Sequence, residues 1–273
     1  MALARPGKVT HRRPEEGWTE GPVLADLAAL VRGDVMVAVD DLVAGYGEMQ
    51  ILHGVTLRVG AGQALCLIGP NGAGKTTVLH AIYGLARVRS GKIVVGGADV
   101  TRLRPSQKLR AAGIAYVLQD NSIFPDMTVE ENLLMGGFLL DHQRRARQAA
   151  ETVFDKYKAL AVRRAHRASV LSGGERRLLE IARALMMNPA VLLIDEPSIG
   201  LEPRVVDVVF ETLKELQQSE GKTIVLVEQN ARKGLEFADI GYVLSAGRVA
   251  MAGTGLELAR NPDVGRLFLG GGD

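Results

Sequence analysis

The chain has 273 residues, 47% of them hydrophobic, which suits one large globular domain or two closely joined ones. Lys and Arg number 33 against 31 Asp and Glu, a net charge of +2, and aromatic residues make up 4%. With so little net charge and so few side chains on which bases could stack, the composition argues against a nucleic-acid partner.

Neither a membrane span nor a secretory leader is visible in the sequence. No apolar run approaches the roughly 18 to 20 residues that cross a bilayer, and the N-terminus lacks the apolar core of a signal peptide. We therefore expect a cytoplasmic chain. The single cysteine, Cys66, has no partner in the chain for a disulfide and is expected to be a small core residue.

Residues 1–34 differ in composition from everything after them. They contain a charged run from Arg12 to Glu16 and one short piece with helical spacing, Val23 to Val31. We expect an N-terminal extension that is loosely packed or disordered. In the alternative interpretation, Trp18 anchors a partner.

From Val35 the pattern becomes short apolar runs separated by glycine. The runs 36–39, 52–59 and 64–68 predict a small antiparallel layer that leads into a larger core. Two further strands are predicted over 92–95 and 114–118.

The middle of the chain has a different character. Residues from about 129 to 186 carry few strand signals, whereas 141–160 and 174–187 have helical spacing, which predicts a helical subdomain inserted into the sheet.

The strand pattern then returns over 191–194, 223–227 and 241–244, with a helix over 204–219. Such continuous apolar runs suit parallel strands covered on both faces, so the predicted class is α/β with a mostly parallel sheet.

A glycine-rich loop follows the run 64–68 and opens a helix over 77–82. Its glycines let backbone amides turn inward around an anion, its lysine supplies a point charge, and a threonine hydroxyl can hold Mg²⁺. The helix N-terminus also favours negative charge. We therefore predict that a nucleoside triphosphate binds here rather than that the loop is a simple turn, and the expected binding residues are Gly69, Pro70, Asn71, Gly72, Ala73, Gly74, Lys75, Thr76 and Thr77.

An acidic pair, Asp195 and Glu196, ends the apolar run 191–194. Asp195 is placed to hold Mg²⁺ together with Thr76, while Glu196 points elsewhere because strand side chains alternate. Glu196 is then the expected general base for an attacking water. Without the preceding loop, a strand-end pair that merely meets solvent would be the better interpretation.

A second candidate anion site opens the helix that begins near residue 176. Ser172, Gly173 and Gly174 place their amides at that helix N-terminus, although Ser172 and Glu175 also have the spacing of a plain capping box. Two anion sites with a single lysine loop make sense if two subunits pair head to tail. Each subunit would then lend its second site to the nucleotide of the other.

Together these motifs resemble those of the ABC-type ATPases, from about Val35 to Leu269. The resemblance implies a P-loop NTPase domain over 35–269 with a tail at 270–273, and it implies ATP and Mg²⁺ as ligands. It also implies that Tyr46 stacks on adenine, although Tyr46 alone would be taken for an exposed turn residue. By the same resemblance, Gln119 touches Mg²⁺ and the attacking water, and 198–203 crosses between subunits.

Two departures from the common pattern narrow the resemblance. Glu175 stands where glutamine is commonest, and Gln229 stands where most relatives carry a histidine that contacts the γ-phosphate. Gln229 is therefore expected among the catalytic residues, but it can donate only a neutral hydrogen bond. With the segments 42–47 and 123–133, the form Glu228-Gln229-Asn230 is similar to the branched-chain amino-acid importer ATPases.

The resemblance implies an ATP-hydrolysing importer subunit held on the inner face of the cell membrane. Its expected partners are membrane permease subunits, docked near 119–126, and a second ABC ATPase subunit in a homo- or heterodimer. A solute-binding protein would act with it indirectly.

Alternatives stay open within and beyond transport. A urea or lipopolysaccharide transporter uses a similar ATPase, although Gln229 argues against the latter. Soluble ABC-type ATPases of repair or translation usually carry two cassettes or a coiled-coil insertion, and this chain has neither. A regulator that binds ATP without turnover is disfavoured by intact Lys75, Asp195 and Glu196.

Overall fold

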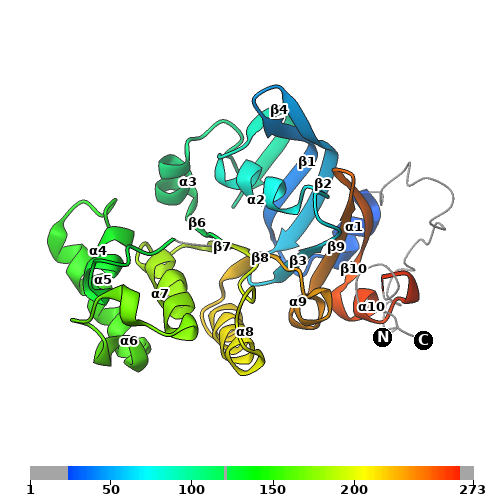
Figure 1. Cartoon of the computed structure of the whole chain (residues 1–273). Helices are drawn as coiled ribbons and strands as arrows, with labels where there is room; N and C mark the ends of the chain where they lie inside the picture. Colours follow the sequence, from blue (N-terminus) through cyan, green and yellow to red (C-terminus); the bar gives the residue numbers. More distant parts are fainter. Residues whose placement is uncertain (1–23, 120–121, 265–273) are drawn as a thin grey trace, which may run out of the picture.

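The computed structural model describes residues 24–119 and 122–264 (Figure 1). Most of the expected extension, with Trp18, and the expected tail at 270–273 lie outside these residues. The described part contains two sheets and a group of helices at one end of the larger sheet.

The smaller sheet is antiparallel and has the strand order β2-β1-β4-β5. Its strands are β1 (Val35–Tyr46), β2 (Met49–Gly60), β4 (Arg87–Val95) and β5 (Ala98–Asp99).

The larger sheet has the order β10-β9-β3-β8-β7-β6, and all its neighbours are parallel except β10 and β9. These strands are β3 (Ala64–Ile68), β6 (Ile114–Val117), β7 (Val191–Asp195), β8 (Thr223–Val227), β9 (Ile240–Ser245) and β10 (Arg248–Thr254). The predicted α/β class with a mostly parallel sheet and a small antiparallel layer is confirmed, and β10 is a strand that the sequence analysis missed.

The faces of the larger sheet are covered by different elements. Leu65 and Leu67 pack with the antiparallel sheet and α2 (Lys75–Tyr83). Cys66 and Ile68 point the other way, into a cluster with α8 (Pro203–Gln218), α9 (Ala231–Phe237) and α10 (Gly255–Ala259). Alternation along β3 produces this division, and Cys66 is the buried core residue that was predicted.

The helical subdomain has its own core, formed by α4 (Val129–Gly136), α5 (Gln143–Lys156), α6 (Lys158–Val162) and α7 (Gly173–Leu185), with a short 3₁₀ turn at Ala168–Val170. The helix predicted over 141–160 is divided in two, because Tyr157 leaves the helical region with φ −106° and ψ 79°. A separate helix, α3 (Pro105–Ala112), precedes β6.

Part of the expected extension packs against the core. Helix α1 (Leu24–Leu30) buries Leu27 completely among the residues of the antiparallel sheet. The Gln63 side chain accepts a 2.9 Å hydrogen bond from the Arg32 amide and donates one of 3.2 Å to the Leu30 carbonyl. Residues 24–34 are therefore attached to the folded domain.

Within 24–119 and 122–264, no helix has the length and apolar character needed to span a membrane.

Candidate functional site

The loop between β3 and α2 has the geometry of an anion cradle. Gly74 is the N-cap of α2 at φ 98° and ψ 8°, a left-handed conformation that favours glycine, and no side chain caps the helix. The first amides of α2 are therefore left for a ligand. The loop lines a cavity of about 360 Å³ together with Ile51 and Glu196.

Lys75 is folded onto its own loop. Its Nζ donates hydrogen bonds to the carbonyls of Gly69 at 2.9 Å and Pro70 at 3.1 Å. Burial lowers the pKa of Lys75, while Glu196 and Asp195 raise it. A phosphate bound in the cavity would be an anionic hydrogen-bond acceptor for the Lys75 ammonium, and a stronger one than these two carbonyl groups.

Asp195, at the end of β7, is 1% exposed and is held by two hydroxyl groups from separate elements. Thr76 Oγ1 on α2 donates to Oδ1 at 3.1 Å, and the Tyr116 hydroxyl on β6 donates to Oδ2 at 2.9 Å. Burial raises the pKa of Asp195, and these hydrogen bonds oppose that rise. The structure thus brings together Thr76 and Asp195, which were predicted to share a metal ion.

Glu196 has a different environment from its neighbour. Its backbone is left-handed at φ 43°, a conformation that costs a residue with a side chain about 1 to 3 kcal/mol and recurs at functional sites. The Glu196 amide donates to the Val227 carbonyl at 2.9 Å, and Gln119 Nε2 donates to Oε2 of Glu196 at 3.0 Å. Two predicted catalytic residues are therefore in direct contact at the edge of the loop cavity.

Tyr46, at the end of β1, is 42% exposed, and its hydroxyl lies 2.5 Å from Nδ1 of His80 on α2. The two rings meet edge to face, and His80 meets Tyr116 in the same way. Burial lowers the pKa of His80. The Tyr46 side chain is thus in contact with α2, the helix that carries Thr76.

Gln229 lies two residues beyond Val227, which pairs with Leu67 on β3 and with Asp195 on β7. The ends of these three adjacent parallel strands therefore meet, and the Gln229 residue is exposed there. Its neighbour Glu228 is buried and accepts hydrogen bonds from the amides of Ser198 at 3.1 Å and Asn230 at 3.0 Å.

Ser172 forms the capping box that was considered as the alternative to an anion site. Its Oγ accepts from the Glu175 amide at 3.3 Å, and Glu175 Oε2 accepts from the Ser172 amide at 2.9 Å. Ser172, Gly173 and Gly174 do not line the cavity at the phosphate loop. Within one chain, the candidate anion site at Ser172 is thus separate from the cavity at the phosphate loop.

Three residues at the site were missed by the sequence analysis: Tyr116, His80 and Glu228. The alternation of β6 does place Tyr116 opposite the buried side chains of Ala115 and Val117, which is a usable signal. The contacts of His80 and Glu228 join distant segments, so the sequence did not indicate them, although Glu228 lies in a motif that the sequence analysis named.

Clusters of three or more His, Cys, Asp or Glu side chains able to hold a metal are absent from the described residues. The oxygen groups gathered here are instead one carboxylate, that of Asp195, and the hydroxyls of Thr76 and Tyr116. Mg²⁺ prefers oxygen ligands of this kind. It takes few of them from the protein, because phosphate oxygens of a bound substrate supply others.

Comparisons of the sequence and of the fold with known proteins point to the same family. The ABC transporter family model matches residues 52–199. The chain is 42% identical over 236 residues to the high-affinity branched-chain amino acid transport ATP-binding protein BraG of Pseudomonas aeruginosa, covering 86% of this chain and 100% of that protein. It is 34% identical over 239 residues to the lipopolysaccharide export system ATP-binding protein LptB of Haemophilus influenzae, covering 86% and 97%.

A solved structure is similar over most of the fold. It is the dimeric structure of a post-hydrolysis state of an ATP-binding cassette bound to ADP and Pi, with a TM-score of 0.70 and 25% identity. The match covers 80% of this chain and 98% of that one.

Proposed function

The chain belongs to the ABC transporter family as an ATPase whose ATP hydrolysis drives transport, and we propose that it powers an importer of branched-chain amino acids. The observation that carries the proposal is its 42% identity with BraG over the whole length of that protein. The Glu228-Gln229-Asn230 sequence after β8 supports the same branch.

Glu196 is proposed as the general base of hydrolysis. It lines the cavity where the phosphates would bind, and Gln119 orients its carboxylate through the 3.0 Å contact. The amides of residues 69–77 and the Lys75 ammonium would hold the phosphates of ATP, and Gln229 would donate a neutral hydrogen bond to the γ-phosphate.

Thr76, Asp195 and Gln119 are the residues proposed to hold Mg²⁺. The 3.1 Å contact of Thr76 with Asp195 supports this assignment, because both groups offer the oxygen ligands that Mg²⁺ prefers. When bound, the ion would neutralise charge that develops on the phosphates.

A second ATPase subunit would complete the site. Ser172, Gly173 and Gly174 lie outside the cavity of their own chain, as expected if they act on the nucleotide of a partner. The dimeric cassette bound to ADP and Pi supports such pairing. Segment 198–203 is proposed to cross between the two subunits.

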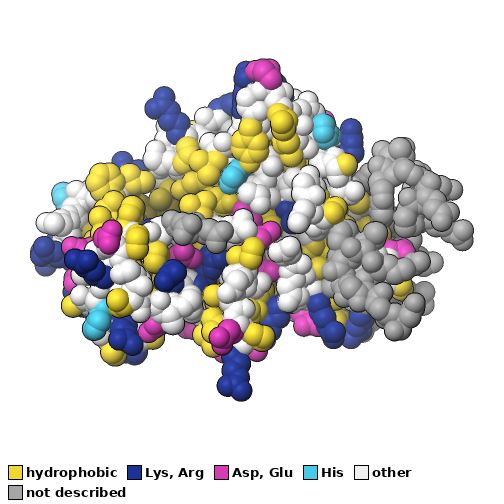
Figure 2. All heavy atoms as spheres, in the orientation of Figure 1, with side chains coloured by type: hydrophobic (Ala, Val, Ile, Leu, Met, Phe, Trp, Pro, Cys, Tyr) yellow, Lys and Arg dark blue, Asp and Glu magenta, His cyan; other side chains and the backbone are white. Residues whose placement is uncertain are grey.

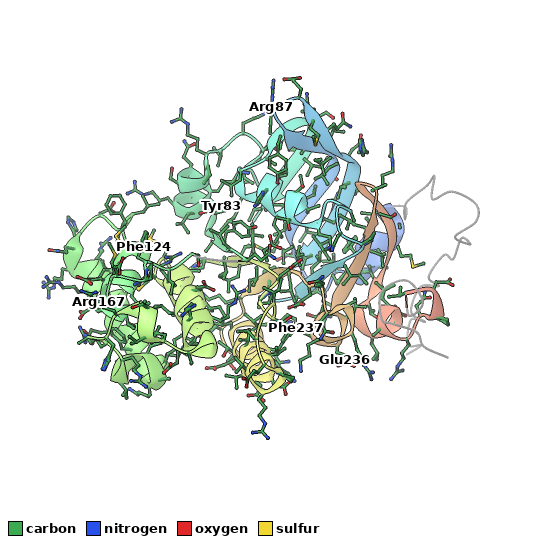
Figure 3. The ribbon with its side chains drawn as sticks, in the orientation of Figure 1. Tyr83, Arg87, Phe124, Arg167, Glu236 and Phe237 are labelled. Atoms are coloured by element: carbon green, nitrogen blue, oxygen red, sulfur yellow. The ribbon has the colours of Figure 1, made fainter. Side chains whose placement is uncertain are left out.

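Permease subunits are proposed to dock beside the Gln119 loop and so hold the chain at the cytoplasmic face of the membrane. Hydrophobic side chains gather between α2, α3 and α4 (Figure 2), and a cavity of about 130 Å³ lies among them. Figure 3 labels Phe124 beside the helical subdomain and Tyr83 at the end of α2. Large exposed apolar side chains on or next to the surrounding elements are Leu85 after α2, Leu118 after β6, Phe124 before α4, Met135 on α4 and Phe138 after α4.

Lipopolysaccharide export is the second candidate, favoured by the 34% identity with LptB over 97% of that protein. A urea transporter or a soluble ABC-type ATPase would share the same site chemistry. These alternatives differ from the importer in their partners, so an experiment on partners separates them.

The deciding experiment is affinity purification from membranes of the Glu196→Gln protein in the presence of ATP, with co-purifying chains identified by mass spectrometry. Recovery of permeases and a second importer ATPase supports the proposal. Recovery of lipopolysaccharide export components would replace the importer with the second candidate. Recovery of soluble partners alone would overturn the importer and leave the ATPase.

A further inference from the structure

Arg177, on α7 of the helical subdomain, reaches out of that subdomain into the catalytic region. Its side chain is 5% exposed, and Nη1 donates to the Leu118 carbonyl at 3.0 Å. Nη2 donates to the carbonyls of Gln119 at 2.9 Å and Glu196 at 3.1 Å. One guanidinium therefore touches the backbone of both residues proposed to act on the water.

Glu180 completes this contact from the next turn of α7. Its side chain is 6% exposed, and Oε2 accepts from Arg177 Nη1 at 2.8 Å. Glu180 and Ser122 line the same small cavity. The pair thus lies near described residues on either side of 120–121, because Arg177 contacts 118–119 and Glu180 lies near Ser122.

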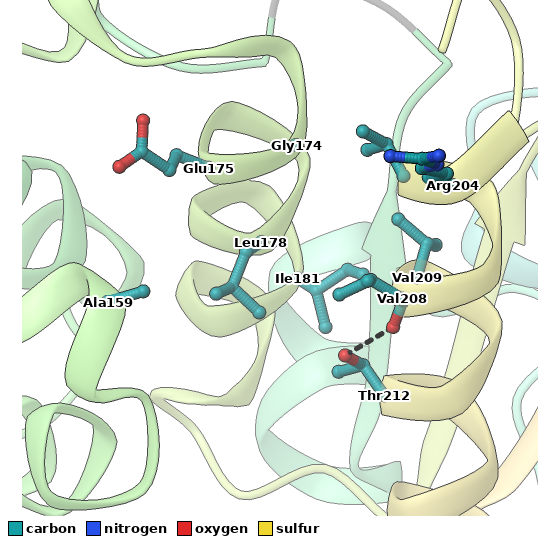
Figure 4. A pocket seen from close by; sticks show the side chains of 10 residues that line it. Ala159, Gly174, Glu175, Leu178, Ile181, Arg204, Val208, Val209 and Thr212 are labelled. Carbon is teal, nitrogen blue, oxygen red and sulfur yellow. Dashed lines mark hydrogen bonds between the residues drawn. The ribbon is translucent and has the colours of Figure 1, made fainter. Parts of the chain in front are cut away.

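Helix α7 is also attached to the core by apolar packing. Ile181 is fully buried in a cluster that includes Val209 of α8. An open groove of about 330 Å³ lies beside this contact, lined by apolar residues such as Leu178 and Val208 (Figure 4). The buried hydrogen bonds of Arg177 add a polar attachment of α7 to the ends of β6 and β7.

We propose that Arg177 and Glu180 form a positioning pair. The pair holds the backbone of residues 118, 119 and 196 against α7, so that the helical subdomain and the catalytic groups move together. This rests on the proposed function, because it assumes that Gln119 and Glu196 act in hydrolysis. Neither member of the pair is assigned a contact with ATP.

The chemistry of the pair explains why a guanidinium is used. Its planar fork donates to three carbonyls and one carboxylate at once, which the compact ammonium of lysine cannot reproduce. Removing Arg177 alone would leave Glu180 as an unpaired buried charge, which is strongly destabilising, whereas replacing both residues by apolar side chains of similar size is often neutral.

The test is therefore the double variant Arg177→Met/Glu180→Met, with Arg164→Met as the matched control. Arg164 also belongs to the helical subdomain and pairs with two carboxylates, Glu130 and Glu151, but both partners lie within that subdomain. Steady-state ATPase kinetics, ATP affinity and thermal unfolding would be measured on all three proteins. Amide hydrogen exchange of the peptide carrying Leu118 and Gln119 would be followed without nucleotide.

The double variant is expected to lose about 10- to 100-fold in kcat, since small misplacement of reacting groups can cost that much. Its ATP affinity should stay within about twofold of the original, because the phosphate loop is untouched. Hydrogen exchange at Leu118 and Gln119 should accelerate, and Arg164→Met should change none of these quantities.

Unchanged kcat in a folded double variant would overturn the positioning role, as would an equal loss in Arg164→Met. If the double variant fails to fold, Arg177→Lys replaces it, since lysine keeps a charge near Glu180 but not the fork. That variant should still lose kcat at unchanged ATP affinity, and retention of full kcat would overturn the proposal. Absence of hydrolysis in the unmodified protein would instead count against the proposed function.

Discussion

Thr76 Oγ1 donates a 3.1 Å hydrogen bond to Oδ1 of Asp195, although the two residues are 119 positions apart in the chain. The contact joins the first turn of α2 to the end of β7. It leaves Asp195 buried among neutral hydroxyl donors, so the free protein carries a carboxylate that is poorly solvated.

Replacing Asp195 by Asn should stabilise the nucleotide-free protein while impairing hydrolysis. Burial raises the pKa of Asp195 above its ordinary value, so between those two values the native state binds more protons than the unfolded state. The free energy of unfolding therefore falls as the pH rises through the raised pKa. Asn does not ionise, and its advantage should be largest above that pKa.

The measurement is thermal unfolding of both proteins at pH 8 and at decreasing pH towards 4. Asp195→Asn should melt higher at pH 8, by about 2 to 4 °C for each kcal/mol gained, and the gap should narrow at low pH. Asp155→Asn, at an exposed position, is the control. A gap that does not depend on pH would contradict the explanation.

Glu196→Gln should bind ATP but hydrolyse it at least about 100-fold more slowly, because an amide cannot accept the proton of the attacking water. The variant should accumulate as an ATP-bound dimer, visible by size-exclusion chromatography with ATP and Mg²⁺. Glu211→Gln, at an exposed position on α8, should behave like the original protein. Full turnover in Glu196→Gln would remove this residue from the base role.

Tyr46→Ala should weaken ATP binding by about 5- to 150-fold, since stacking of a base on an aromatic ring is worth about 1 to 3 kcal/mol. Tyr46→Phe keeps the ring and loses only the hydroxyl that contacts His80. Its affinity should stay close to that of the original. Titration with a fluorescent ATP analogue measures both, and equal losses in the two variants would show that the hydroxyl matters rather than stacking.

Phe124→Asp should reduce the fraction of the protein that sediments with membranes, because it places a charge in the proposed permease-docking surface. The ATPase activity of the isolated subunit should change little. Val162→Asp is the control, since Val162 is highly exposed on α6 and outside that surface. Equal membrane recovery for the two variants would argue against docking at Phe124.

Lys108→Met should lower the free energy of unfolding by about 1 to 3 kcal/mol, because two helix-end carbonyls lose their donor. Lys108 is fully buried, and its Nζ donates to Ala81 at 3.2 Å and Ile82 at 2.7 Å. Urea unfolding measures the change. Lys92→Met removes a half-exposed surface lysine and should have a much smaller effect.

The strands that position the site were predictable because their apolar runs are continuous and end in recognisable polar residues. β3 and β7 are fully buried, and each leads directly into a motif, the phosphate loop or Asp195. Each motif on its own indicates a ligand for Mg²⁺, so Thr76 and Asp195 could be paired in advance although they lie far apart in the chain.

Arg177 could not be found in this manner. On an amphipathic helix an arginine followed three residues later by a glutamate reads as a solvated ion pair. Its burial depends on how α7 packs against β6 and β7, which is a property of the whole fold. The break at Tyr157 was missed for a related reason, because the apolar spacing of the two short helices continues across it.

The attachment of α1 has a practical consequence for protein production. A shortened chain that starts at Val35 would remove Leu27 from the core and leave the Gln63 side chain without the Arg32 amide and the Leu30 carbonyl. The uncovered apolar patch would favour aggregation during expression. An expression clone should therefore start upstream of residue 24, even when only the ATPase domain is wanted.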